Sequence, residues 1–149
     1  MKVLLDTNKI ITMVKDQDSY KLGLQEIINS GNHYFTTPLI RHEALRFYSH
    51  NAEDSEKCQR AMQLLSLLEI INIDKNITDI ATNIVRYERT TYPERYHKQA
   101  DGTEKKIDKY NFDIMFVATA KCFDLNTDSN DGDIPKLIEL YDEMKKTRK

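Results

Sequence analysis

The sequence lacks several features that would assign it to common classes of protein. It contains no tryptophan and only four glycines among 149 residues, and it has neither a GxGxxG nor a GxxxxGK[ST] motif. A phosphate-binding loop needs closely spaced glycines, so these absences argue against a glycine-rich nucleotide site. The two cysteines, Cys58 and Cys122, do not have the spacing of a metal site, and we expect each to pack as a small apolar residue.

Long apolar runs are also missing. No stretch approaches the roughly 20 consecutive apolar residues that cross a bilayer, and Asp6 interrupts the first apolar stretch, which excludes a signal-peptide pattern. We therefore expect a cytoplasmic protein without a membrane partner. The length predicts a single domain over residues 1–149. The formal net charge of −2 neither favours nor excludes a nucleic-acid partner, because local patches matter more than the sum.

What the sequence does contain is an alternation of short β-favouring runs with longer stretches of helical periodicity. The runs predict strands at 2–5, 34–36, 70–73 and 125–127, and most of the chain between them is typical of helices. Such alternation predicts an α/β fold, with a parallel sheet of about four or five strands between two layers of helices.

The first strand ends at a carboxylate. Lys2–Leu5 has no polar alternation, which is typical of a strand buried on both faces. Asp6 follows directly, at the place where open α/β sheets bind ligands. The alternative is that Asp6 or Thr7 only caps the next helix.

Further acids stand in comparable places. Glu43 lies in the helix after the second strand, and Asp113 lies in an apolar helix before the last strand. Asp128 or Asp131 follows that last strand. The ordinary interpretation makes Glu43 an exposed helix residue and Asp113 the partner of a lysine. Because parallel strands end at one edge of a sheet, we expect these acids to share a cleft.

Several carboxylates within a few ångströms of one another repel strongly. A divalent cation is the ordinary way to hold them, and ligation by oxygen alone suits Mg²⁺ or Mn²⁺. Such an ion activates water and stabilises the charge that develops during phosphodiester cleavage. The pattern of acids therefore predicts a divalent-metal site of a kind that can support phosphodiester cleavage.

Residues 90–107 have no apolar period and are predicted to form a charged loop insertion. From Arg86 to Lys109 there are seven basic and five acidic side chains, interleaved with Tyr92, Tyr96 and His97. A segment of this kind can contact a phosphate backbone and stack on bases, although a merely solvated loop has the same composition. The candidates for RNA contact are Arg86, Arg89, Arg95, Lys98, Lys105 and Lys106.

Taken together, the acidic segments resemble those of the PIN-domain ribonucleases, and in particular the VapC-like toxins. Val3–Asn8 is similar to the family's opening strand, which ends in an acid, a hydroxyl residue and an amide or acid. Residues 37–43 and 113–120 resemble its second and third acidic segments. Residues 127–131 resemble the threonine-acid loop that closes the motif, and Asp133-Ile134-Pro135 stands as a displaced equivalent of the residues after its last aspartate.

The resemblance implies a metal-dependent endoribonuclease that cleaves single-stranded or structured RNA as the toxin of a toxin–antitoxin pair. Asp6, Glu43 and Asp113 would hold Mg²⁺ or Mn²⁺, with Asp128 or Asp131 as the fourth acid. Asn8 or Thr127 would orient a carboxylate or water. The resemblance also implies an antitoxin partner and a homodimer.

Two other classes remain as alternatives. A non-catalytic adaptor on the same fold would bind RNA or protein without cleavage, but all the acidic positions are filled, which disfavours it. A phosphoryl-transfer or receiver-type protein would need a phosphoacceptor aspartate at a later strand end and a supporting lysine after a strand, and no lysine is well placed for this.

Overall fold

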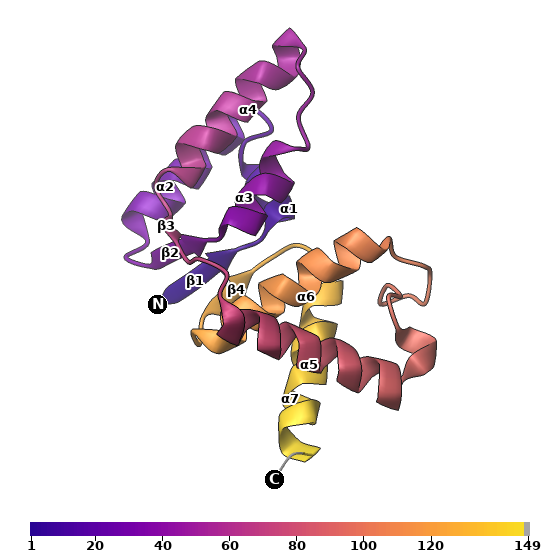
Figure 1. The fold of residues 1–149 in the computed structure, drawn as a ribbon. Coiled ribbons are helices and arrows are strands. Elements are labelled where there is room, and N and C mark those ends of the chain that lie inside the picture. Colours follow the sequence, from indigo (N-terminus) through magenta and orange to yellow (C-terminus); the bar gives the residue numbers. More distant parts are fainter. Residues whose placement is uncertain (148–149) are drawn as a thin grey trace. The chain divides into compact units, whose positions relative to one another are not determined.

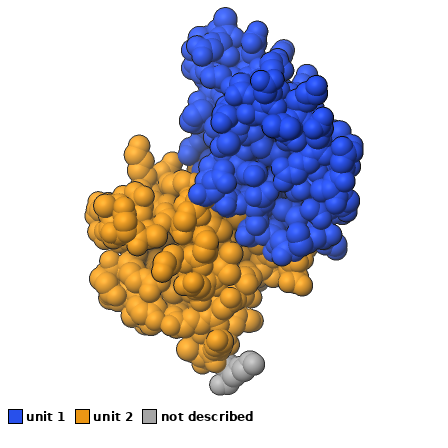
Figure 2. All heavy atoms as spheres, turned by 180° about the vertical axis from the view of Figure 1, so that it is seen from behind, with its two compact units in different colours: residues 1–72, 125–130 blue, residues 73–124, 131–149 orange. Residues whose placement is uncertain are grey.

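The computed structural model describes residues 1–147, which form two compact units (Figure 2). Unit 1 contains Met1–Asn72 and Leu125–Asn130, and unit 2 contains Ile73–Asp124 and the chain from Asp131 onward. The chain passes from unit 1 into unit 2 at Ile73, returns to unit 1 for six residues from Leu125 to Asn130, and enters unit 2 again at Asp131. The prediction of one nuclease domain over 1–149 stays a prediction.

Unit 1 is built on a four-stranded sheet in which all neighbouring strands are parallel, which confirms the predicted α/β class (Figure 1). The strands, in the spatial order β3-β2-β1-β4, are β3 (Glu69–Ile70), β2 (His33–Thr36), β1 (Lys2–Leu5) and β4 (Asn126–Asp128). Val3, Leu4 and Leu5 are consecutive and all buried, so β1 is covered on both faces as predicted.

Four helices complete unit 1. They are α1 (Thr7–Met13), α2 (Gln17–Asn29), α3 (Pro38–Leu45) and α4 (Ala52–Leu65). The sequence predicts Ser19 as the cap of α2, but the helix begins earlier, because Asp16 accepts a hydrogen bond from the Ser19 backbone N–H at 2.7 Å and so caps it. An aspartate is an equally good cap and lies three residues earlier, which accounts for the shift.

Unit 2 consists of three helices that pack on one another. They are α5 (Lys75–Thr91), α6 (Ile107–Cys122) and α7 (Asp133–Thr147), and their shared core is apolar: Ile77, Ile84, Ile114, Val117, Leu140 and Met144.

The sequence predicts Asp108 as the cap of α6, but Asp108 lies in the first turn, where it accepts a hydrogen bond from the Lys109 N–H. No helix within residues 1–147 has the length and apolar character needed to cross a membrane.

The predicted loop at 90–107 is more ordered than its composition indicates. α5 continues to Thr91, and a single 3₁₀ turn follows at Pro93–Arg95. Lys98 and Glu104 then pair as an antiparallel bridge around a tight turn. Gly102 lies in this turn with a φ of 89°, a conformation that glycine adopts without strain.

Candidate active site

Asp6 stands directly after β1 and is 2% exposed. Its Oδ1 accepts a hydrogen bond from the Thr7 backbone N–H at 2.8 Å, which makes it the N-cap of α1. Its Oδ2 accepts from the hydroxyl of Ser129, which follows β4, at 2.6 Å. Asp6 is therefore a helix cap, as the alternative interpretation held. It is also a carboxylate at the carboxyl end of two neighbouring strands, and the two roles are compatible because they use different oxygen atoms.

Thr7 connects Asp6 with Glu43. Thr37 caps α3 and Pro38 occupies its first position, as the sequence predicts, and Glu43 follows within the helix. The Thr7 hydroxyl donates a hydrogen bond to Glu43 Oε1 at 2.5 Å. One residue thus holds two acids, Asp6 through its backbone N–H and Glu43 through its hydroxyl. The structure therefore brings Asp6 and Glu43 together within unit 1.

Asn8 and Thr127 also lie near this strand end. Asn8 Oδ1 is 3.4 Å from the backbone N of Asn130 and 3.5 Å from the hydroxyl oxygen of Ser129, so it links α1 to the loop after β4. Thr127 is paired with Leu4 in the register of the sheet. Their expected role in orienting a carboxylate or water stays a prediction.

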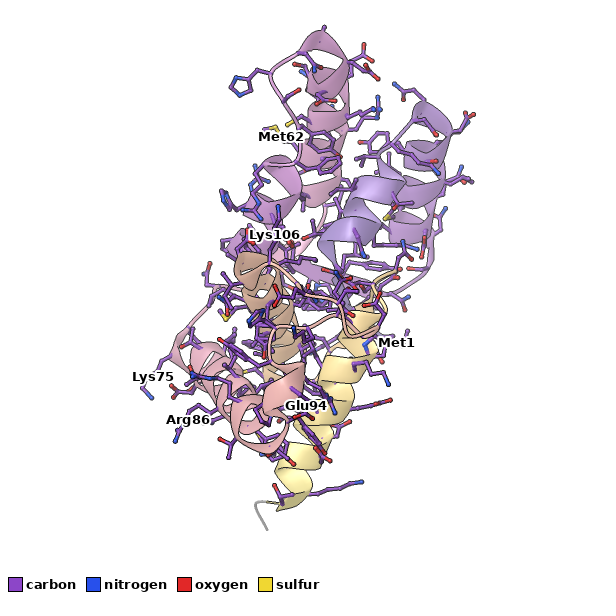
Figure 3. The ribbon with its side chains drawn as sticks, turned by 90° about the vertical axis from the view of Figure 1, so that its right-hand side faces the viewer. Met1, Met62, Lys75, Arg86, Glu94 and Lys106 are labelled. Atoms are coloured by element: carbon purple, nitrogen blue, oxygen red, sulfur yellow. The ribbon has the colours of Figure 1, made fainter. Side chains whose placement is uncertain are left out.

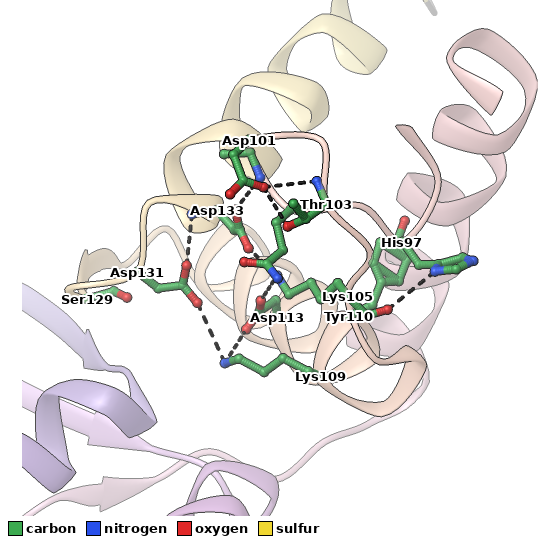
Figure 4. A network of polar contacts seen from close by, with 12 residues as sticks. His97, Asp101, Thr103, Lys105, Lys109, Tyr110, Asp113, Ser129, Asp131 and Asp133 are labelled. Carbon is green, nitrogen blue, oxygen red and sulfur yellow. Dashed lines mark hydrogen bonds and ion pairs between the residues drawn. The ribbon is translucent and has the colours of Figure 1, made fainter. Parts of the chain in front are cut away.

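A second group of acids lies in unit 2, formed by α6 and the chain entering α7 (Figure 4). Asp113 is 1% exposed in the middle of α6, and Asp131 and Asp133 are half-buried. One carboxylate oxygen from each lies within 4.8 Å of the other two. The Asp133 backbone N–H donates to Asp131 Oδ1 at 2.9 Å, which fixes the turn before α7. We call Asp113, Asp131 and Asp133 the acidic trio.

Two lysines face the acidic trio, as Figure 4 shows. Lys105 Nζ forms ion pairs with Asp113 Oδ2 and, at 2.8 Å, with Asp133 Oδ2. Lys109 Nζ lies 2.9 Å from Asp113 Oδ1 and 3.7 Å from Asp131 Oδ2. Asp113 therefore pairs with two lysines, as the alternative interpretation held for one. Burial raises the pKa of the Asp113 carboxyl, and the two ammonium groups oppose that rise.

The residues of the acidic trio also fit a divalent cation. Asp113 Oδ2 is buried and, within the described part of the chain, has no hydrogen bond of normal geometry, although Lys105 forms an ion pair with it. All the donors are carboxylate oxygens, the ligands that Mg²⁺ and Mn²⁺ prefer. An ion held here would offset the mutual repulsion of the acids.

The sequence allows either Asp128 or Asp131 as the fourth acid, and the structure distinguishes them. Asp128 is the last residue of β4, and its carboxylate lies 3.8 Å from Lys9 Nζ in unit 1. Asp131 is grouped with Asp113 instead. Asp131 therefore lies in the acidic trio and Asp128 near Lys9, and which of them binds a metal stays a prediction.

The candidates for RNA contact differ in how exposed their side chains are. Arg86, Arg89, Arg95 and Lys106 are exposed, and Figure 3 shows the Arg86 side chain extending away from α5. Arg95 lies over the Tyr92 ring at 4.3 Å, and Lys98 is half-buried and paired with Glu104. Lys105 differs, because it is 7% exposed and paired with acids. A buried ammonium group is not accessible to a phosphate backbone. Lys105 is therefore an ion-pair partner of the acidic trio rather than part of an RNA-binding surface.

Sequence reasoning missed Thr7, Ser129 and the two lysines as parts of these groups. For Lys109 a signal existed, since it stands four residues before Asp113 and such pairs are neighbours on one helix face. Thr7 and Ser129 act through hydrogen bonds between segments far apart in the sequence. Their hydroxyls have no local pattern that separates them from other serines and threonines.

A buried acid outside the acidic trio predicts how stability depends on pH. Glu88 in α5 is 5% exposed and accepts a hydrogen bond from the Tyr110 hydroxyl at 2.7 Å. Burial raises the pKa of Glu88, and the Tyr110 hydrogen bond and the charges of Arg95 and Lys105 oppose the rise. The pKa of Glu88 is higher in the folded state than in the unfolded chain. At pH values between these two pKa values, the folded state therefore binds more protons. The free energy of unfolding therefore falls as pH rises from the pKa of the unfolded chain through the raised pKa of the folded state.

We expect Glu88→Gln to remove this loss, because glutamine can still accept the Tyr110 hydrogen bond without carrying a charge. The melting temperature should rise at neutral pH, and the difference from wild type should shrink toward acidic pH. Thermal unfolding followed by circular dichroism across this range measures it. Glu94→Gln, at an exposed acid in the 3₁₀ turn that follows α5, should have little effect. A Glu88→Gln protein less stable than wild type at neutral pH would show that the charged form is well solvated.

The comparisons with known proteins agree with this architecture. The family model described as PIN domain matches residues 3–140, which include most of both units. A solved structure of VapBC2 from Rickettsia felis, bound to a DNA fragment from their promoter, has a similar fold, with a TM-score of 0.60 and 17% identity over 88% of each chain. Among curated protein sequences, none matches the chain. The extent of the family match shows that the chain belongs to the PIN domain family.

Proposed function

We propose that the chain is a metal-dependent endoribonuclease in which Asp6, Glu43, Asp113 and Asp131 hold Mg²⁺ or Mn²⁺. The observation that carries the proposal is the burial of Asp113 next to two further carboxylates. A charged group in such a place is costly unless cations compensate it. Lys105 and Lys109 pair with Asp113 in this structure, and a divalent ion would compensate the whole acidic trio. Membership of the PIN domain family supports the same assignment.

The bound ion would supply a water nucleophile and stabilise the negative charge that develops on the phosphate during cleavage. The chain's own residues prepare the acids for this role. Thr7 fixes Glu43 through its hydroxyl, and the Thr7 N–H and the Ser129 hydroxyl each fix one oxygen of Asp6. Held in this way, the carboxylates do not need to reorganise during the reaction, which is where enzymes gain much of their rate.

Removal of the metal is the direct test. We expect the chelated protein to leave a single-stranded oligoribonucleotide intact, and added Mn²⁺ or Mg²⁺ to restore cleavage, followed with a fluorophore and quencher at the two ends. The ion should also raise the melting temperature, because a ligand that binds only the folded state stabilises it by about 2.7 kcal/mol at about 100 times its Kd. Cleavage that persists unchanged after exhaustive chelation would contradict the proposal.

A non-catalytic adaptor is the second candidate, and one observation favours it. The two lysine ion pairs compensate Asp113 without any metal, as in a purely structural network. The adaptor would bind the same oligoribonucleotide in the presence of Mn²⁺ and leave it intact over hours. The nuclease would cleave it, so one gel distinguishes the two.

We further propose that the chain acts as the toxin of a toxin–antitoxin pair and forms a homodimer. The structure of similar fold is described as VapBC2, bound to DNA from their promoter. Expression of the chain alone should then arrest bacterial growth, and an Asp113→Asn chain should not. Sedimentation measures the oligomeric state independently of either result.

A further inference from the structure

Lys105 is an unusual lysine in this chain because its ammonium group is buried. The residue is 7% exposed, and its Nζ is held by Asp113 Oδ2 and Asp133 Oδ2. Removing an ammonium group from water costs several kcal/mol, and only close anionic partners offset the cost. Lys109, by contrast, has a side chain that is 36% exposed and comes from the same helix as Asp113. Lys105 is therefore the buried counter-ion of the acidic trio.

Lys105 is brought to the acidic trio by a short loop, residues 97–105, which we call the strap. The strap closes on itself, since the Lys105 N–H donates to His97 O at 3.0 Å and the Gln99 N–H donates to Thr103 O at 2.8 Å. The Ala100 backbone N–H donates to Asp133 Oδ1 at 2.7 Å. The strap thus holds both oxygens of Asp133, one through Ala100 and one through Lys105.

Lys105 contacts oxygens of two members of the acidic trio, and one of them, Asp113, is a ligand in the proposed function. Asp113 Oδ2 is buried and otherwise without a hydrogen bond of normal geometry among the described residues, and Lys105 covers it. An ammonium group and a metal ion cannot occupy the space between the same two carboxylates. Binding of one therefore requires departure of the other, which makes them competitors for the acidic trio.

Space for the displaced side chain exists beside the strap. A cavity of about 330 Å³ in unit 2 is lined by Lys105 itself and by three glutamates, Glu88, Glu94 and Glu139. Arg95, Lys98 and Lys136 also line the cavity, so an ammonium group that leaves Asp113 and Asp133 would meet both carboxylates and other cations there.

We propose that Lys105 is an internal cation that occupies the acidic trio in the metal-free protein, and that binding of a divalent ion displaces it together with the strap. This regulation of metal loading rests on the proposed function, because it concerns the same acids. It predicts that the strap lowers the affinity for the ion. It also predicts that the metal-free protein depends on Lys105 for stability, whereas the metal-bound protein does not.

The test is the affinity for Mn²⁺, measured by titration calorimetry without any RNA. Lys105→Met should bind Mn²⁺ about tenfold more tightly or better, since one nearby opposite charge changes the proton affinity of a carboxylate about 10- to 1000-fold. Lys105→Gln should behave in the same way, and it keeps a polar group if the methionine variant does not fold. Lys105→Arg keeps the charge and should stay close to wild type. The matched control is Lys121→Met, which removes the lysine of an ion pair with Asp142 elsewhere in unit 2.

A second readout follows the strap directly. Mn²⁺ should accelerate trypsin cleavage within residues 97–105 of the wild-type protein, because the strap loses its anchor on Asp133. An unchanged or weaker Mn²⁺ affinity in both neutral variants overturns the proposal, as does a strap that Mn²⁺ protects. If the neutral variants bind Mn²⁺ more tightly but no variant cleaves RNA, the nuclease assignment fails and the role of Lys105 stands. If wild type cleaves RNA and the neutral variants bind Mn²⁺ with the same affinity as wild type, the nuclease assignment stands and the proposed role of Lys105 fails.

Discussion

Asp113→Asn is expected to abolish RNA cleavage and also to lower the melting temperature of the metal-free protein, because Lys105 and Lys109 each lose an anionic partner. Asp113 is the most buried member of the acidic trio, and asparagine keeps its size and an oxygen acceptor while removing the charge that a divalent ion needs. Even residues that only support metal ligands cost about 10- to 100-fold in activity when they are replaced, so we expect a loss of about 100-fold or more. Initial rates with a fluorogenic oligoribonucleotide at saturating Mn²⁺ measure it.

The matched control for this variant is Asp142→Asn. Asp142 is an exposed acid of α7 that pairs with Lys121, so the same change of charge is made in the same unit but outside the acidic trio. Its activity should match wild type. An Asp113→Asn protein that retains wild-type activity would remove Asp113 from the reaction and favour its role as a structural partner of Lys105 and Lys109.

Asp6→Asn is expected to cause a loss of similar size for a different structural reason. Asparagine is as good an N-cap as aspartate, so the hydrogen bond from the Thr7 N–H and the start of α1 should survive. Only the negative charge at the end of β1 is lost. We expect cleavage to fall about 100-fold or more, with the melting temperature nearly unchanged.

Asp16→Asn provides the matched control for Asp6→Asn. Asp16 caps α2 through a hydrogen bond from the Ser19 N–H, which reproduces the capping chemistry at an exposed helix start. If Asp16→Asn is active and Asp6→Asn is inactive, capping is not the essential role of Asp6. If the two variants are equally active, Asp6 acts only as a helix cap and takes no part in cleavage.

The strand that carries Asp6 could be predicted because its signal is local. Lys2–Leu5 is an apolar run without alternation that stops at a charged residue, and a run of this kind is typical of a buried strand. Thr37 and Pro38 predicted the start of α3 in the same way. The parallel sheet followed from the alternation of the elements, and its four strands lie within the predicted number.

The composition of the acidic trio could not be predicted, because it depends on the path of loops. Residues 128–133, from the last residue of β4 to the first residue of α7, contain three candidate acids, and a shift of a few residues decides which of them faces α6. In the structure the Asp133 N–H donates to Asp131 Oδ1, and both of these acids lie near Asp113. The position of Lys105 follows from hydrogen bonds within the strap, for which the sequence offers only a glycine at the turn.

The central claim is that Asp6 and Asp113 are each needed to bind the divalent ion, and Mn²⁺ binding tests it most directly. Electron paramagnetic resonance of free Mn²⁺ gives the affinity of wild type, Asp6→Asn and Asp113→Asn without any RNA. We predict that wild type binds the ion and that each substitution weakens binding by about tenfold or more. Wild-type affinity in either variant, or no binding by wild type at millimolar Mn²⁺, would contradict the claim.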